Sequence, residues 1–250
     1  VNNKSVSGVE LENGEILEAD YVVSNADMWY TETKMLDTKD QTYPEKYWEK
    51  STMAPTAFIM YLGLNTEVPN LTHHNLRFCK YWKENFREIF DQPQLPKDPS
   101  YYVCKPTHTD KNIAPEGKDI LFVLVPLPYE INPSEKEKKD YRDKVINMMK
   151  ADLDLPNLEN MIHYERSYWG DDFARDYNAY KGNALGGQAH TLKQTLLRPH
   201  NKSKKVKNLF YVGAGTNPGI GVPTSLISSQ LAYKRIEGIK HPHPLTNLDN

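Results

Sequence analysis

The sequence is poor in the residues that disulfide and metal chemistry need. Only two of its 250 residues are cysteines, Cys79 and Cys104, and they lie far apart with no metal-type partners beside them in the sequence. The eight histidines follow no ligand spacing either, since His73 and His74 form a pair in a polar stretch and two others lie in a proline-rich tail. We therefore expect a reduced, cytoplasmic protein without a metal site.

Charge of one sign and long hydrophobic runs are also missing. The formal net charge is −2 and 26% of the residues are charged, so the basic surface that nucleic acid requires is not expected. No apolar run approaches the ~18 residues that a membrane-spanning helix needs. These absences argue against nucleic-acid binding and against an integral membrane protein.

A glycine-rich loop near the C-terminus lacks the residues of the common nucleotide fingerprints. In "NLFYVGAGTNPGIGVPTSLISSQ", residues 208–230, four glycines separate an apolar strand from a helix that begins near Pro223. No Gly-Lys-Ser/Thr follows, and no second strand with a ribose-binding acid follows about 20 residues on. The loop either completes a nucleotide site whose main fingerprint lies elsewhere, or is a strand–helix connection that needs glycine only for tight packing.

The beginning of the chain predicts short strands. Residues 6–27 predict a hairpin, because apolar and polar residues alternate around the turn dipeptide Asn13-Gly14. A short apolar strand follows at 21–23. Since the chain starts with Val1 rather than methionine and enters strand-like sequence at once, we expect a fragment whose N-terminal portion is missing.

The middle of the chain changes to longer strands and one strong helix. A capped, amphipathic helix is predicted at 134–153, with acidic residues in its first turn. The segment 183–195 is rich in small residues, so we expect it to pack closely against a ligand or another backbone. Aromatic and β-branched runs predict strands at 56–64, 75–82, 100–108, 119–128 and 161–169. Strand pieces at both ends around a mixed α+β middle indicate a discontinuous two-domain architecture.

Several long phrases resemble one enzyme family. "NLFYVGAGTNPGIGVP" resembles the C-terminal signature of the bacterial-type phytoene dehydrogenases, the FAD-dependent carotenoid desaturases. "HHNLRF", "WKENFREIF", "LPKDPSYYVCKPTHTDKNIAPEGKDILFVLVPLP", "LLRPHNKSKKVKNLF" and "ADYVVSNAD" are also similar to that family, so the resemblance covers most of residues 8–238. In this family the GxGxxG fingerprint lies at the N-terminus. The resemblance therefore implies the C-terminal half to two-thirds of a desaturase.

The resemblance implies an α/β and α+β fold, the C-terminal part of a two-domain FAD-dependent oxidoreductase. Residues 1–27 and 206–240 would be parts of an incomplete Rossmann-like FAD-binding domain, 28–205 a mixed-sheet substrate domain, and 241–250 a tail. Asn217 replaces the usual histidine of the signature, which puts any proton transfer there in doubt. The residues that the resemblance places at FAD are Gly213, Ala214 and Gly215 near the ribityl and pyrophosphate groups, Thr216 and Asn217 after them, and Gly219, Gly221, Val222 and Pro223 at the isoalloxazine edge.

The implied reaction is desaturation of a linear carotenoid precursor, phytoene or 4,4'-diapophytoene (dehydrosqualene), by hydride transfer to flavin. Arg198 is a weak catalytic candidate that could steady charge; a surface position or a structural ion pair is the alternative. A long apolar polyene must be bound by apolar burial. Strand residues that could line a hydrophobic tunnel, or simply form ordinary core, are Phe58, Met60, Leu62, Phe122, Leu124 and Leu127.

Such a substrate also implies peripheral contact with a membrane surface. In "KYWKENFREIF", residues 80–90, Trp82, Phe86, Ile89 and Phe90 follow helical spacing, and basic residues are available for lipid headgroups. A plain amphipathic core helix is the alternative explanation of the same spacing.

Two other functions fit parts of the same sequence. One is another FAD oxidoreductase of the amine oxidase superfamily that acts on an amine or an isoprenoid. The other is a non-catalytic lipid-binding fragment, because half a dinucleotide site should hold FAD poorly. Substrate length, oligomeric state and the final electron acceptor stay open.

Overall fold

A computed structural model describes residues 1–245 and divides the chain into two compact units. The split unit consists of Val1–Ala54 and Ala174–Asn250, and the continuous unit is Pro55–Phe173. The split unit takes in both chain ends, as the sequence-based division does, but its inner limits lie at 54 and 174 rather than at 27 and 206. Of the tail expected at 241–250, residues 246–250 lie outside the described part.

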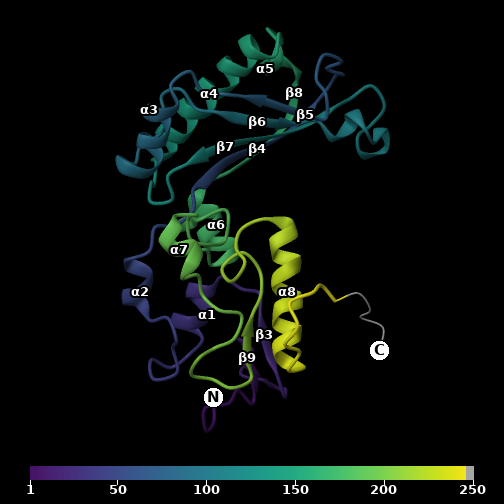
Figure 1. Ribbon diagram of the computed structural model, residues 1–250. Coiled ribbons are helices and arrows are strands. Elements are labelled where there is room, and N and C mark those ends of the chain that lie inside the picture. Colours follow the sequence, from purple (N-terminus) through teal and green to yellow (C-terminus); the bar gives the residue numbers. More distant parts are fainter. Residues whose placement is uncertain (246–250) are drawn as a thin grey trace. The chain divides into compact units, whose positions relative to one another are not determined.

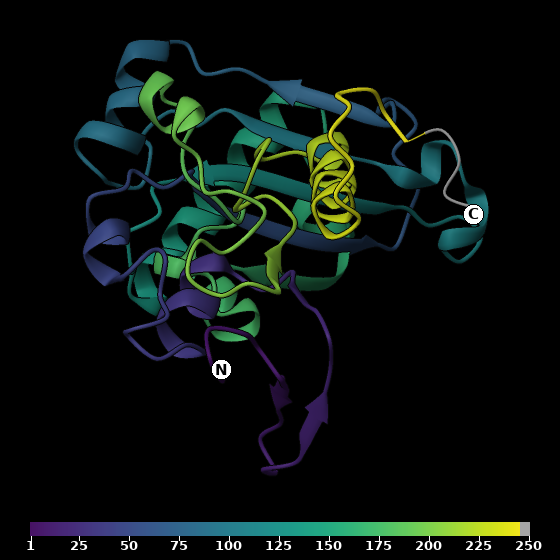
Figure 2. The same cartoon turned by 60° about the horizontal axis from the view of Figure 1, so that its bottom comes forward.

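Strands from the two ends of the chain pair in the split unit. β1 (Gly8–Glu10) and β2 (Ile16–Glu18) form the predicted antiparallel hairpin, which Figure 2 shows apart from the other strands. β3 (Val22–Ser24) pairs in parallel with β9 (Leu209–Tyr211), and α8 (Val222–Ile236) follows β9 (Figure 1). The parallel pair joins segments that are far apart in the sequence, as the discontinuous architecture predicts.

Short helices that the sequence did not predict complete the split unit. They are α1 (Met28–Lys34), α2 (Glu45–Glu49), α7 (Leu192–Leu196) and a 3-10 turn at Tyr180–Gly182, with α6 (Gly170–Tyr177) at the boundary between the units. Asp27 caps α1 by accepting a hydrogen bond from the amide of Tyr30. These helices are one or two turns long, which is too short to establish a period of 3.6 residues.

A buried carboxylate ties α1 to β9. Glu32 is fully buried and accepts hydrogen bonds from the amide of Tyr43, at 2.9 Å, and from the hydroxyl of Tyr211. Burial raises the pKa of Glu32 above its usual range, although both hydrogen bonds oppose that shift. The network stabilises the packing of the first helix against the last strand.

The continuous unit is built on a five-stranded antiparallel sheet in the order β5-β6-β7-β4-β8. Its strands confirm the predicted runs, but β5 and β6 are shorter than expected. After β6 the chain turns into 3-10 helices at Pro106–His108 and Lys111–Ile113, and after β5 it turns toward a helix. The strands are β4 (Thr56–Leu64), β5 (His74–Arg77), β6 (Tyr101–Cys104), β7 (Ile120–Leu127) and β8 (Ile162–Tyr168).

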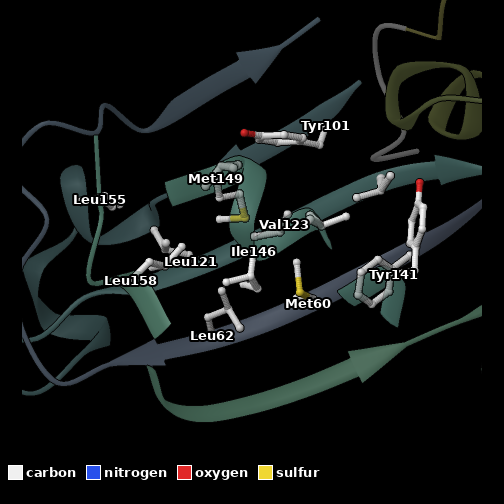
Figure 3. Close-up of a cluster of buried hydrophobic side chains, with 14 of the residues drawn as sticks. Met60, Leu62, Tyr101, Leu121, Val123, Tyr141, Ile146, Met149, Leu155 and Leu158 are labelled. Carbon is white, nitrogen blue, oxygen red and sulfur yellow. The ribbon is translucent and has the colours of Figure 1, made fainter. Parts of the chain in front are cut away.

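One face of this sheet is covered by α4 (Glu135–Asp152), the predicted long helix. Ser134 and Glu137 form a capping box at its start. Figure 3 shows side chains of the helix, such as Ile146 and Met149, packed against Met60 and Leu62 of the sheet. α5 (Leu158–Met161) adds Leu158 to the same core.

The tunnel interpretation fails for four of its six residues. Phe58, Met60, Leu62 and Leu127 are at most 1% exposed and belong to the core beneath α4, so the ordinary-core alternative is right for them. Because strand side chains alternate, Phe122 and Leu124 lie on the opposite face.

The segment 80–90 is helical, but the core-helix explanation is wrong for most of its aromatic side chains. α3 (Trp82–Phe86) continues into a π-helical turn at Arg87–Asp91. Ile89 is buried, whereas Trp82, Phe86 and Phe90 are 48%, 53% and 37% exposed. The helical spacing places these rings on one exposed row rather than in the core.

The structure brings to Cys104 two metal-type side chains that the sequence did not indicate. β5 and β6 pair with His74 directly opposite Cys104, and His73 lies next to them. Strand pairing brings together residues that are about thirty positions apart in the sequence, which spacing along the chain does not reveal.

Candidate functional site

A cavity of about 540 Å³ lies in the split unit where β9 passes into α8. Its wall comes mainly from the glycine-rich loop and the first turns of the helix, with Asn25 just after β3 and Ala184 and Leu185 of the 183–195 segment. The lining includes Asn25, Ala184, Gly213, Ala214, Gly221, Val222 and Ser225. Four of the nine residues expected to bind FAD therefore line one cavity.

The loop has a shape that requires glycine at two of these positions. Gly213 has φ +97°, and a Cβ there would lie 2.7 Å from Oδ1 of Asn25. Gly221 has φ +132°, and its Cβ would lie 2.9 Å from Oγ1 of Thr224. The positive φ strains any other residue at both positions, and a Cβ would also displace the side chain of Asn25 or Thr224. The amide of Gly213 donates to Oγ of Ser228, at 2.7 Å, which fixes the loop against α8.

Small residues also let a second backbone segment approach the loop. A Cβ on Gly187 would lie 2.7 Å from the carbonyl oxygen of Ala214, and one on Gly215 would lie 3.2 Å from Cβ of Met28. This confirms the close packing expected of the 183–195 segment. Gly215 takes part in the same packing, because a Cβ there would also lie 3.3 Å from the carbonyl oxygen of Gly186.

Thr216 and Asn217 hold the loop to the Arg198-Pro199 segment. Oγ1 of Thr216 donates to the carbonyl of Pro199 at 2.8 Å, and the amide of Asn217 donates to the same oxygen at 3.0 Å. Asn201 completes the connection by donating its side-chain amide to the carbonyl of Asn217 at 2.8 Å. Neither Thr216 nor Asn217 is among the described residues that line the cavity.

Arg198 is buried beneath the loop. It is 2% exposed, so the surface interpretation is wrong, and no carboxylate in the described part of the chain pairs with it. Nη1 donates to the carbonyl of Gln188 at 3.3 Å, and a Cβ on Gly219 would lie 3.0 Å from the guanidinium carbon. Nε and Nη2 have no hydrogen-bond partner among the described residues. Burial lowers the pKa of Arg198.

The start of α8 faces the cavity with its own donors. The N-cap residue Gly221 provides no side-chain cap, Val222 is exposed, and Pro223 occupies the first turn, where its missing N–H is harmless. The free amides of a helix start carry partial positive charge. The cavity is therefore suited to a negatively charged or strongly accepting group.

Comparison with known proteins shows the family of the chain. The sequence profile of the flavin-containing amine oxidoreductases matches residues 2–236. The chain belongs to this family. Its relatives include carotenoid 3,4-desaturase of Haloarcula japonica, 43% identical over 89% of this chain and 45% of the relative, and zeta-carotene-forming phytoene desaturase of Myxococcus xanthus, 42% identical over 92% and 44%. The resemblance to carotenoid desaturases is confirmed.

The chain spans less than half the length of these desaturase relatives. An oxidoreductase of known crystal structure from Methanosarcina mazei shares the mixed α/β fold over 95% of this chain and 47% of its own, with a TM-score of 0.50 and 15% identity. Within residues 1–245, no helix is both long and apolar enough to cross a membrane.

Some residues of the site were not expected from the sequence. Asn25 directly follows an apolar strand, and the carboxyl ends of parallel strands are where α/β sheets bind ligands. The signal was therefore present, but it depended on knowing that β3 pairs with β9. Ser228 carried no signal, because a serine one helical turn away from Ser225 looks like any solvent-facing residue.

Proposed function

We propose that the protein containing this chain is an FAD-dependent desaturase of a linear carotenoid precursor. The observation that carries the proposal is the cavity under the glycine loop, in a chain whose relatives are named as carotenoid desaturases. The precursor would be either phytoene or 4,4'-diapophytoene.

The residues present fit a flavin cofactor. A Cβ on the glycines of the loop would collide with neighbouring atoms, so the loop keeps a small, tightly packed shape. The start of α8 offers amides without a side-chain cap, and the cavity has room for a group of several rings. Ala214, Gly221, Val222 and Pro223 would hold the cofactor, with Gly213, Gly215 and Gly219 shaping the loop beneath it. Bound FAD supplies a hydride acceptor for the oxidation of a saturated carbon–carbon bond.

This chain contributes electrostatics and shape to that reaction. The positive end of α8 stabilises negative charge beside Gly221 and Val222. Arg198 adds a buried positive charge behind Gly219, and its two unpartnered nitrogens, Nε and Nη2, call for an acceptor that a bound group or water supplies. Arg198 is thus a positioning residue for the loop and its ligand.

The second face of the five-stranded sheet suits a polyene. Rings from three adjacent strands contact one another across it, with Tyr61 and Phe122 at a centroid distance of 5.5 Å and Phe122 and Tyr102 at 6.3 Å. Tyr61 is 41% exposed. Because the substrate has no polar handle, apolar surface of this kind must supply its affinity.

The exposed aromatic row suits contact with the bilayer that supplies the substrate. The row consists of Phe78, Trp82, Phe86 and Phe90, whose neighbouring rings lie 5.6 to 6.1 Å apart. Lys83 and Arg87 lie on the same helical segment, where they can reach lipid phosphates. The protein would then act at the membrane surface.

The test is a pigment assay. The full coding sequence that contains this chain is expressed in one host that accumulates phytoene and in another that accumulates 4,4'-diapophytoene. We expect coloured products with longer conjugation in one host, which also identifies the substrate class. Colourless cells that contain intact, flavin-loaded protein would refute the desaturase proposal.

A further inference from the structure

Three side chains with metal-binding atoms meet at one corner of the sheet in the continuous unit. His74 and Cys104 lie opposite each other in the β5–β6 pair, so their side chains share a face. The ring of His73 lies 4.3 Å from that of His74, centroid to centroid. One ligand atom from each of the three residues falls within 4.8 Å of the other two.

The hydrogen bonds around His73 leave one nitrogen ready for a metal. The hydroxyl of Thr109 donates to the carbonyl of Pro106 at 3.3 Å, so it accepts from Nδ1–H of His73 at 2.8 Å. That tautomer keeps the lone pair on Nε2. An outer hydroxyl or carbonyl that holds the second ring nitrogen is the usual arrangement around metal-binding histidines.

His74 has an equivalent outer partner. Its Nδ1 lies 2.7 Å from the hydroxyl of Tyr102, and the two rings stack at a centroid distance of 5.9 Å. Tyr102 is the neighbour of Cys104 on the same face of β6, two residues away. The tyrosine therefore orients the imidazole toward the thiol and leaves its Nε2 unoccupied by that bond.

We propose that His73, His74 and Cys104 bind a divalent transition-metal ion of the zinc class, with a fourth position open to solvent. Two imidazoles and a thiolate select borderline-soft ions and disfavour Mg²⁺ and Ca²⁺, which take oxygen ligands. Zinc bonds of ~2.0–2.3 Å place tetrahedral ligand atoms roughly 3.3–3.8 Å apart. The three ligand atoms already lie within 4.8 Å of one another, and the exposed His74 side chain has room to adjust when the ion binds.

The ion would act as a clamp on the edge of the sheet. β5 has four residues and lies at one edge of the sheet, where β6 is its neighbour. A metal joining both strands, with Thr109 behind it, links the edge strand to the turn that follows β6. Because the ion binds the folded strands, it stabilises them by an amount that grows with the logarithm of its free concentration above the Kd.

The first measurement is a Co²⁺ titration of the full chain, with the thiolate-to-cobalt charge-transfer absorption as readout. The band is expected in the unmodified protein and in Cys79→Ser, whose thiol is buried elsewhere in the unit, and it is expected to vanish in Cys104→Ser. Zn²⁺ should displace the cobalt and remove the band. Retention of the band in Cys104→Ser would overturn the proposal.

A second measurement separates this site from adventitious histidine binding. Zn²⁺ titration calorimetry should show at least tenfold weaker binding in His73→Asn and His74→Asn, with no change in His163→Asn, an exposed histidine of β8. The tail pair His241 and His243 is replaced by asparagine in every variant, because it offers a competing site. Circular dichroism confirms that each variant is folded, and equal affinity in all of them would refute the site.

Discussion

Single residues decide the shape of the glycine loop and the integrity of the continuous unit. The loop depends on glycines at positions where a Cβ has no room, and the continuous unit depends on a buried ion pair. The ammonium group of Lys105 lies 3.0 Å from the carboxylate of Asp119, and both side chains are at most 4% exposed. Each feature gives a substitution with a predictable effect.

Gly213→Ala should destabilise the split unit and weaken flavin binding. The left-handed backbone costs an alanine about 1–2 kcal/mol, and contact with Asn25 adds overpacking of about 1–3 kcal/mol. Gly14→Ala is the matched control, because Gly14 has φ +82° but no atom within 4 Å of its Cβ position. Urea unfolding of both variants measures the difference. Equal losses in the two would contradict the close contact at Gly213.

Lys105→Met should cost about 3–5 kcal/mol of unfolding free energy, since it leaves a buried carboxylate without its partner. The exposed pair of Lys39 and Asp37 is the control, and Lys39→Met should change stability by less than about 1 kcal/mol. Urea unfolding at neutral pH compares the two variants. A loss in Lys105→Met no larger than in the control would show that the pair is dispensable.

The same carboxylate predicts how stability depends on pH. Although burial opposes it, hydrogen bonds from Thr107 and the Val68 amide, together with Lys105, hold the pKa of Asp119 below its usual range. Its stabilising contribution is therefore complete above the usual aspartate pKa of about 3.9 and is lost as the pH falls through the lower folded value. In Lys105→Met the loss should begin at higher pH, and an unchanged acid limb of the stability curve would argue against this assignment.

A helix or strand can take part in binding where its apolar side chains stay outside the core. The aromatic row of α3 and the following π-helical turn is such a case, because its spacing is that of an amphipathic helix while its rings are exposed. The second sheet face is another, since strand alternation places one set of side chains under α4 and leaves the other set outside that core. In both, burial rather than periodicity distinguishes the side chains of the core from those left available for the proposed contacts.

Replacement of Trp82, Phe86 and Phe90 by serine should lower binding to lipid vesicles at least tenfold, because three apolar rings no longer enter the interface. Flotation with vesicles that contain anionic lipid measures the change. Leu192→Ser with Leu196→Ser is the matched control, since these α7 side chains are 80% and 76% exposed but lie outside the row. Absence of flotation in the unmodified protein would remove the membrane from the proposed function.

At the scale of the whole molecule, the chain supplies only part of a relative's length. A loop and a helix start line the cavity in which we propose that flavin binds, and relatives carry further sequence beyond the matched region. We expect the chain within its full coding sequence to purify with flavin, and the 250 residues alone to retain little at equal protein concentration. Flavin absorbance after purification measures both. Stoichiometric flavin on the isolated chain would show that this region is sufficient.

Much of the fold could be predicted because its signals are local. The aromatic and β-branched run in 56–64, the capping residues at Ser134 and Glu137 and the turn at Asn13-Gly14 each act within a few residues. The short helices α1 and α2 could not be predicted in this way, since tertiary packing rather than a periodic pattern stabilises them. α7 buries no side chain, and hydrogen bonds of Gln194 with the backbone of Thr52 hold it in place.

The features of the candidate site also divide into those that local sequence signals predict and those that only tertiary contacts bring together. The sequence by itself determined that the loop from Gly213 to Pro223 joins a strand to a helix, and that its long phrases resemble carotenoid desaturases. Only the tertiary structure decided that Asn25 completes the cavity, that Arg198 lies buried beneath Gly219, and that His74 meets Cys104 across two strands. The reason is physical: turn and helix signals act over neighbouring residues, whereas cavities, buried charges and cross-strand clusters arise when distant segments are brought into contact.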